Sequence, residues 1–158
     1  MSAVPRLHST IVALFALSLV SCVTHRQRDG RYAFIAEEVA RDDCGILGPS
    51  PELSGGTLHI SGDVVTLDYD LFGIQLRGQF REVSERFFLD GTASDVTATV
   101  GNEACHIDLV QVHIDGTTES PEAFSGTLII RYDVLTHERC RCEMSVRFRA
   151  ELTPSAPK

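Results

Sequence analysis

The sequence predicts an all-β domain, an eight-stranded antiparallel up-and-down barrel, with a β-sandwich as the alternative. Apolar and polar residues alternate in several segments, which is typical of strands that bury one face. Turn residues recur about every eight to twelve positions, and no segment after the N-terminal region keeps a helical period. Alternation alone does not separate a closed sheet from two packed sheets, so both architectures remain open on this pattern.

Eight segments are predicted to be strands: residues 31–39, 57–60, 64–70, 74–80, 86–100, 104–114, 124–134 and 141–152. The last alternates most clearly, and its inward face is predicted to hold Cys142, Met144, Val146, Phe148 and Ala150. Glycines and prolines are dense in residues 41–56, which are therefore predicted to be a loop. Gly62 and Asp63 have the residue types of a tight hairpin turn.

Residues 86–100 could form one bent strand or two short ones, because Asp90 and Gly91 interrupt them. The cysteines favour one bent strand. In an eight-stranded barrel with that strand undivided, one rim collects all four cysteines of the domain: Cys44, Cys105, Cys140 and Cys142. In the sixth segment the apolar positions change parity, which predicts a β-bulge near Leu109.

The N-terminal residues have the layout of a signal peptide. Residues 1–10 carry Arg6 and His8 but no acid, and residues 11–20 are almost entirely apolar. A helix needs about 20 apolar residues to cross a bilayer, so this run is too short for a permanent span.

The segment Leu19-Val20-Ser21-Cys22 resembles a bacterial lipobox, which ends in an obligatory cysteine after small or aliphatic residues. This resemblance implies cleavage before Cys22 and attachment of diacylglycerol to its thiol, with further acylation, such as palmitate, at the new amino terminus. Val23 is not the aspartate that often retains lipoproteins at the inner membrane. The resemblance thus implies a protein anchored in the bacterial outer membrane.

Four regions follow from this interpretation: a signal peptide (1–21), a lipidated tether (22–29), a single β domain (30–152) and a polar tail (153–158). Loss of Arg6 with the signal peptide changes the net charge from −8 to −9. An acidic surface argues against nucleic acid as a partner. The expected partner is the membrane, which the protein would contact through its lipid.

The other four cysteines, an even number in an exported chain, predict two disulfides. Cys140 and Cys142 are two apart on one strand, where their side chains are about 6.5 to 7 Å from each other. That is too far for a disulfide between them. Two pairings remain open, in which Cys44 bonds either to Cys140 or to Cys142.

Gly30, Arg31 and Tyr32 resemble the start of the first strand in lipocalins, where a tryptophan occupies the third position. The resemblance implies a carrier of a small apolar ligand, held in the barrel mouth. The aromatic residues that would contact it are Tyr32, Phe34, Phe80 and Phe148. Ordinary core packing is the alternative role for these side chains.

No catalytic, metal-binding or cofactor site is predicted. Asp68 and Asp70 lie on the same strand face and could form a calcium site. Their presence on a solvated strand face is explained without one. His106 could orient Asp108, and a hydrolase using this pair is a second alternative, but no nucleophile motif accompanies it. His137 lies near Cys140 and Cys142, whose thiolates would suit zinc or copper if they were not oxidised.

From the sequence we therefore expect a lipid-anchored envelope lipoprotein whose β domain is a non-enzymatic binding or structural module. A lipocalin-like carrier is the first alternative, and a hydrolase is the second.

Overall fold

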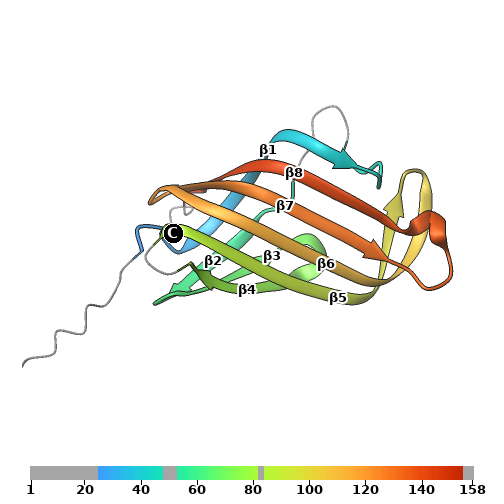
Figure 1. Cartoon of the computed structure of the whole chain (residues 1–158), viewed down its shortest axis with the longest axis horizontal. Coiled ribbons are helices and arrows are strands. Elements are labelled where there is room, and N and C mark those ends of the chain that lie inside the picture. The colour runs from blue at the N-terminus through green and yellow to red at the C-terminus, as the bar shows by residue number, and fades with distance from the viewer. Residues whose placement is uncertain (1–24, 48–52, 82–83, 155–158) are drawn as a thin grey trace, which may run out of the picture.

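The chain forms a closed eight-stranded antiparallel β-barrel in which each strand pairs with its neighbours in sequence. The computed structural model describes residues 25–47, 53–81 and 84–154. The predicted signal peptide, Cys22 and most of the polar tail lie outside the described residues. The predicted up-and-down barrel is confirmed (Figure 1).

The strands and two short 3-10 helices follow one another in this order: β1 (Gly30–Asp42), β2 (Gly56–Ser61), β3 (Val64–Tyr69), η1 (Leu71–Gly73), β4 (Ile74–Phe80), β5 (Arg86–Val100), β6 (Glu103–Ser120), β7 (Ala123–Asp133), η2 (Glu138–Cys140) and β8 (Cys142–Leu152). The segment from Arg86 to Val100 is one strand, as predicted. The last strand buries the five side chains that its alternation predicts.

Two strand ends differ from the prediction by more than one residue, because neighbouring strands extend the pairing. β1 continues to Asp42 rather than ending at Val39, since it pairs with β8 as far as Met144. β6 continues to Ser120 rather than ending at Ile114, because β7 pairs with it from Leu109 to Ser120. The loop between β1 and β2, predicted to begin at residue 41, therefore begins after Asp42.

Gly62 and Asp63 form the predicted two-residue connection between β2 and β3. Gly62 has a φ of 61°, a left-handed conformation that glycine adopts without strain. Ser61 and Val64 pair directly across this turn, which closes the hairpin. β2 and β3 have only 6 residues each, and this shortness matters for the shape of the barrel.

The side chains that face inward change parity within β5 and β6. In β6 the buried positions change from odd to even numbers between Ile107 and Val110, as predicted near Leu109. The predicted one-strand bulge is wrong, because β5 makes the same change beside Asp95, so the register of the pair does not shift. Asp95 has a φ of 55°, which reorients the chain locally.

The barrel has two ends, which we name by what they carry. The N-terminal rim holds residues 25–29, the C-terminal end of β8 and the connections β2–β3, β4–β5 and β6–β7. The disulfide rim holds the connections β1–β2, β3–β4, β5–β6 and β7–β8. This arrangement follows from the up-and-down order, since alternate connections lie at the same end.

Side chains fill the interior near the N-terminal rim. Phe124 is fully buried and its ring lies 5.1 to 5.8 Å, between centroids, from four other aromatic rings. Those rings belong to Tyr32 and Phe34 in β1, Phe87 in β5 and Phe148 in β8. Burial of aromatic surface at this end therefore ties β1, β5, β7 and β8 together.

The strands are unequal in length, and the barrel is closed by all eight only near the N-terminal rim. β2, β3 and β4 have 6, 6 and 7 residues, whereas β5 and β6 have 15 and 18. β1 pairs with β2 only from Gly30 to Tyr32, and β4 pairs with β5 only from Arg77 to Phe80. The half toward the disulfide rim is therefore a sheet of β5, β6, β7, β8 and β1.

Candidate functional site

Two disulfides join the elements that meet at the disulfide rim. Cys44, after β1, bonds to Cys142 at the start of β8, with a Cα–Cα distance of 5.1 Å. Cys105 in β6 bonds to Cys140 in η2, with a Cα–Cα distance of 5.8 Å. The prediction of two disulfides at one rim is confirmed. Of the two pairings left open by the sequence, the structure has Cys44 with Cys142.

The disulfides remove the thiolates that a metal site at this rim would need. Cys140 and Cys142 are both oxidised, so His137 has no free thiol beside it from either residue. Among the residues that the structure describes, no cluster of three or more His, Cys, Asp or Glu side chains could hold a metal ion.

His106 and Asp108, the pair considered for the hydrolase alternative, have different partners in the structure. His106 Nε2 instead lies 3.7 Å from Asp95 Oδ1, and these two side chains are 59% and 82% exposed. Asp108 Oδ2 accepts a hydrogen bond of 2.6 Å from the backbone N–H of Leu135. The parity change in β6, between Ile107 and Val110, begins at Asp108, so alternation from His106 onward does not give the partner of this residue.

The two aspartates considered for a calcium site, Asp68 and Asp70, and a further histidine, His113, also lie on the outer surface with separate partners. His113 Nδ1 is 2.7 Å from Asp90 Oδ1, across the β5–β6 pair. Asp68 accepts a hydrogen bond from Gln75, and Asp70 pairs with Arg31 at 2.6 Å. Asp68 and Asp70 are thus held apart by different neighbours rather than combined in one carboxylate site.

The four candidate ligand contacts lie inside the barrel wall. Tyr32, Phe34, Phe80 and Phe148 are each at most 5% exposed. The rings of Phe34 and Phe148 stack with centroids 4.8 Å apart, and Phe80 packs edge-on against Phe87 at 5.3 Å. A ligand at this position would have to displace aromatic side chains that pack on one another.

A small apolar cavity opens near the disulfide rim, above this packed region. Its volume is about 140 Å³, and it is lined mainly by apolar side chains from the β1–β2 loop and from β7 and β8, with two tyrosines, Tyr69 and Tyr132. Burial raises the pKa of both phenols, and that of Tyr69 lies well above its usual range. Both hydroxyls therefore remain protonated at neutral pH and can donate a hydrogen bond.

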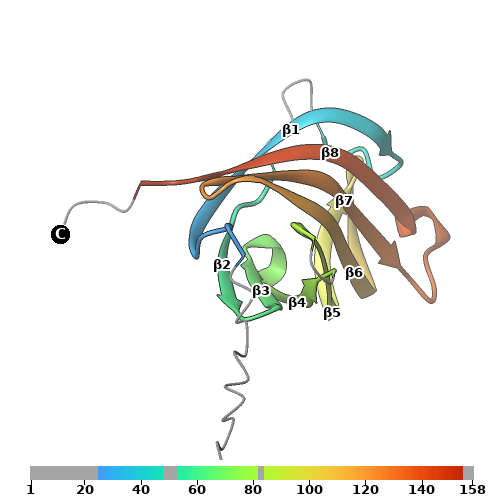
Figure 2. The ribbon, with the colours of Figure 1, turned by 60° about the vertical axis from the view of Figure 1, so that its left-hand side comes forward.

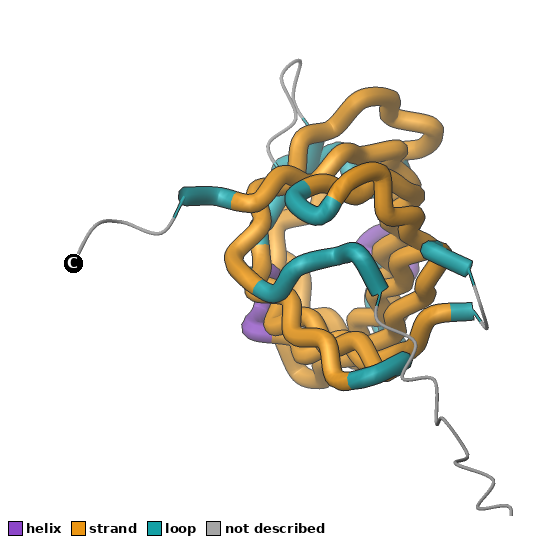
Figure 3. Tube along the Cα trace, turned by 90° about the vertical axis from the view of Figure 1, so that its left-hand side faces the viewer, coloured by secondary structure: helices purple, strands orange, loops and turns teal. Residues whose placement is uncertain are grey.

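Residues 25–29 close the opposite end. The His25 ring stacks on Phe80 with centroids 3.5 Å apart, and its Nε2 lies 3.0 Å from Asp63 Oδ1. Gln27 is buried and donates a hydrogen bond of 2.6 Å to the Tyr32 hydroxyl, which donates to the Arg28 carbonyl. Figure 3 shows this segment crossing the opening of the ring of strands.

This packing differs from the expectation that residues 22–29 are all tether. Sequence reasoning missed the role of Gln27, because a lone glutamine in a polar stretch gives no signal of burial. The pairing of Gln27 with the Tyr32 hydroxyl explains why a tyrosine can occupy the buried end of β1, since its polar atom finds partners there.

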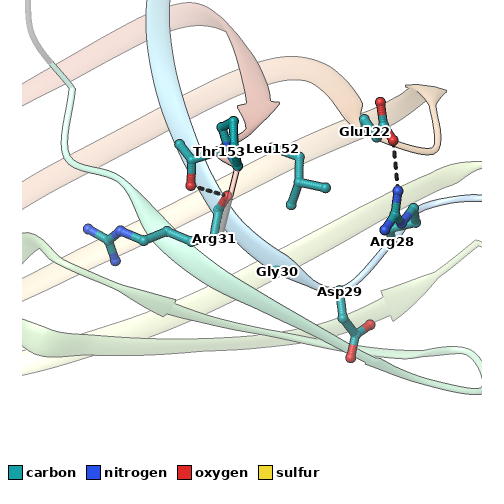
Figure 4. A pocket seen from close by; sticks show the side chains of 8 residues that line it. Arg28, Asp29, Gly30, Arg31, Glu122, Leu152 and Thr153 are labelled. Atoms are coloured by element: carbon teal, nitrogen blue, oxygen red, sulfur yellow. Dashed lines mark hydrogen bonds and ion pairs between the residues drawn. The ribbon is translucent and has the colours of Figure 1, made fainter. Parts of the chain in front are cut away.

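An open groove lies on the outside of the N-terminal rim, where Arg28 and Arg31 flank the end of β8 (Figure 4). Its volume is about 520 Å³. Arg28 pairs with Glu122 at 2.7 Å, and Arg31 pairs with Asp70. Each arginine thus already has a carboxylate partner, which leaves the groove without a free cationic pair for an anion.

A short ion-pair network lies outside the disulfide rim. Glu143 receives hydrogen bonds from Arg131 Nε at 2.6 Å and from Arg41 Nη1 at 3.0 Å. The hydrogen bond from Arg131 is the main reason that the pKa of Glu143 lies below its usual range, with Arg41 adding to the effect. The network links three neighbouring strands, β1, β7 and β8, so we assign it a structural role.

No family model, curated protein or solved structure matches this chain. Within the described part of the chain, no helix has the length and apolar character needed to cross a membrane.

Proposed function

We propose that this protein is a bacterial envelope lipoprotein, anchored in the outer membrane through acyl groups on Cys22, with the barrel as a non-enzymatic binding or structural module. The lipobox-like segment Leu19-Val20-Ser21-Cys22 supports the anchor. The two disulfides support export, because such bonds persist in oxidising compartments.

The observation that carries the proposal is how soon the folded barrel begins after the anchor. His25, only three positions after Cys22, already packs on Phe80 at the N-terminal rim. An anchor at Cys22 would therefore bring this rim close to the bilayer and direct the disulfide rim away from it. The module would then present its disulfide rim and outer walls to other envelope components.

Acyl labelling tests the anchor. The chain is expressed in a bacterial host that is fed an alkyne analogue of palmitate, and the labelled protein is detected after purification. We expect label on the wild type and none on Cys22→Ser, because the chemistry requires that thiol. The double variant Cys44→Ser/Cys142→Ser should keep the label. Label that survives in Cys22→Ser, or a wild type without label, would count against the proposal.

A carrier of a small ligand is the alternative that a specific observation favours. The cavity of about 140 Å³ near the disulfide rim is close to the size of engineered apolar cavities that bind benzene. Tyr69 and Tyr132 would add one hydrogen bond to a ligand with a polar group. Native mass spectrometry of gently extracted protein, with indole as the added probe, checks this: a bound species that disappears in Leu71→Trp supports a carrier.

A further inference from the structure

β1 has a pairing partner on only one side over most of its length. It pairs with β8 from Tyr32 to Asp42, but its pairing with β2 ends at Tyr32. In Figure 2, β1 follows β8 away from the short strands β2, β3 and β4. Residues 33–42 are therefore a free sheet edge, as far as the described chain shows.

The direction of the free backbone groups follows from the hydrogen bonds at the start of β1. The Arg31 carbonyl accepts from the Thr153 N–H at 2.8 Å, so this pair is hydrogen-bonded. Hydrogen-bonded and non-bonded pairs alternate along an antiparallel ladder. In the regular register from Tyr32 to Ala36, the N–H and C=O groups of Phe34 and Ala36 must then point away from β8. Among the described residues no backbone group bonds to them.

The side chains beside this edge are unusual for a solvated surface. Ile35 and Val39 are 49% and 41% exposed on the outer face. Glu37 is also exposed and forms no ion pair with any described residue, whereas Glu38 pairs with Arg147 at 3.2 Å. The edge thus offers apolar contact area next to one carboxylate that has no cationic partner there.

The second free edge, on β5, is less suited to pairing. Asp95 lies in its middle with a φ of 55° and a side chain that is 82% exposed. An irregular backbone and an exposed charge are devices that discourage the addition of a strand. β1 also has irregular positions, with register shifts between Ala36 and Glu38 and between Val39 and Arg41, but its segment from Tyr32 to Ala36 keeps a regular register with β8 and carries no charged side chain.

We propose that an extended segment of a partner protein adds as a strand to the β1 edge at residues 33–36. Its backbone would hydrogen-bond to Phe34 and Ala36, its apolar side chains would cover Ile35, and a basic residue would face Glu37. Addition of a strand to an exposed edge is a recurring mode of peptide recognition, in which the main chain supplies affinity and side chains supply specificity.

A second copy of this chain fits the edge less well, and this step rests on the proposed anchor. Two β1 edges would pair antiparallel about a twofold axis, which points the two N-terminal rims in opposite directions. Copies anchored through Cys22 in one bilayer have these rims on the same side. The orientation therefore favours a different polypeptide as the occupant.

Hydrogen exchange on the full chain in detergent tests the proposal. The probe is an eight-residue peptide that alternates valine with threonine, with lysine in place of two of the valines, so that apolar and basic side chains share one face of the added strand. We expect saturating peptide to slow exchange of the Phe34 and Ala36 amides by about tenfold or more, because a new strand protects them. The same peptide with methylated backbone nitrogens should have no effect, and a version with glutamate for lysine should bind more weakly.

Two variants localise the binding. Ala36→Pro removes an edge N–H without breaking the β8 ladder and should abolish the protection, provided that circular dichroism shows a folded barrel. Ile35→Glu leaves the backbone intact and should weaken peptide binding several-fold, so it carries the test if Ala36→Pro does not fold. The matched control is Val64→Glu, which alters an exposed apolar residue at the N-terminal rim and should bind normally.

The proposal is overturned if the peptide slows neither amide, if protection appears on β5 instead, or if Ile35→Glu binds as well as the wild type. Analytical ultracentrifugation that finds a dimer dependent on Ile35 would also overturn it, in favour of a second copy. The same exchange measurement on Cys22→Ser separates this proposal from the anchor, because strand addition does not require the lipid.

Discussion

Phe124 is the side chain on which the core near the N-terminal rim depends most. It contacts rings from β1, β5 and β8, and no part of it reaches solvent. We expect Phe124→Ala to lower the free energy of unfolding by about 3 to 5 kcal/mol, since it removes apolar contacts and leaves a cavity. Urea denaturation measures the loss. Phe72→Ala, at a ring that is 37% exposed, serves as control, and equal losses would contradict this view of the core.

Glu143 gives a pH-dependent contribution of predictable sign. Its pKa is lower in the folded protein than in the unfolded chain, because Arg131 and Arg41 stabilise the carboxylate. The contribution is therefore complete above the usual glutamate pKa of about 4.3 and disappears as the pH falls through the lower, folded value. We expect Glu143→Gln to cost about 1 kcal/mol or less at neutral pH and nothing in strong acid.

Urea titrations of Glu143→Gln and the wild type at neutral pH and in acid measure this difference. Glu37→Gln is the control, because Glu37 forms no ion pair with a described residue. A Glu143→Gln effect that is the same at both pH values would show that the two arginines do not act on the carboxylate.

Many contacts of individual residues are predictable from the sequence, and those of His106 and Asp108 are exceptions. The inward face of β8 follows from alternation, and the two disulfides follow from the even number of cysteines in the domain. The partners of His106 and Asp108 do not, because they depend on a parity change that two adjacent strands make together. In β5 the change occurs at Asp95, which has a φ of 55°. An aspartate within a strand does not by itself indicate such a change.

At the scale of elements, the two disulfides close chain segments of different length. Cys44 and Cys142 are 98 residues apart, and Cys105 and Cys140 are 35 apart. A chain-entropy model assigns about 4.7 kcal/mol to the first and about 3.8 kcal/mol to the second. We expect Cys44→Ser/Cys142→Ser to be less stable than Cys105→Ser/Cys140→Ser, as measured by thermal denaturation. The reverse order would show that the strain or packing at these sites outweighs the loop length.

The existence and order of the strands are predictable, whereas their lengths are not. Alternation identifies each strand because one face is buried. It cannot set the ends of β1 and β6, since those ends depend on how far β8 and β7 continue beside them. The uneven lengths in turn create the free β1 edge, so that edge is visible only in the folded structure.

At the scale of the whole molecule, the barrel has one end closed by its own N-terminal segment and one end stapled by disulfides. The sequence predicts the second feature, because the four cysteines fall at one rim of an eight-stranded barrel. It does not predict the first, because the burial of Gln27 depends on the tertiary position of Tyr32. With an anchor at Cys22, the N-terminal rim would face the bilayer and the disulfide rim would point away from it.

The distance of each rim from the bilayer tests this polarity most directly. β5 spans roughly 50 Å along its 15 residues, which is enough to separate the two rims in an energy-transfer measurement. A fluorescent unnatural residue replaces Val64 at the N-terminal rim or Leu135 at the disulfide rim, in protein reconstituted into vesicles with an acceptor on the lipid headgroups. We predict strong transfer from position 64 and weak transfer from position 135. Equal transfer, or stronger transfer from position 135, would contradict an anchored barrel that stands on its N-terminal rim.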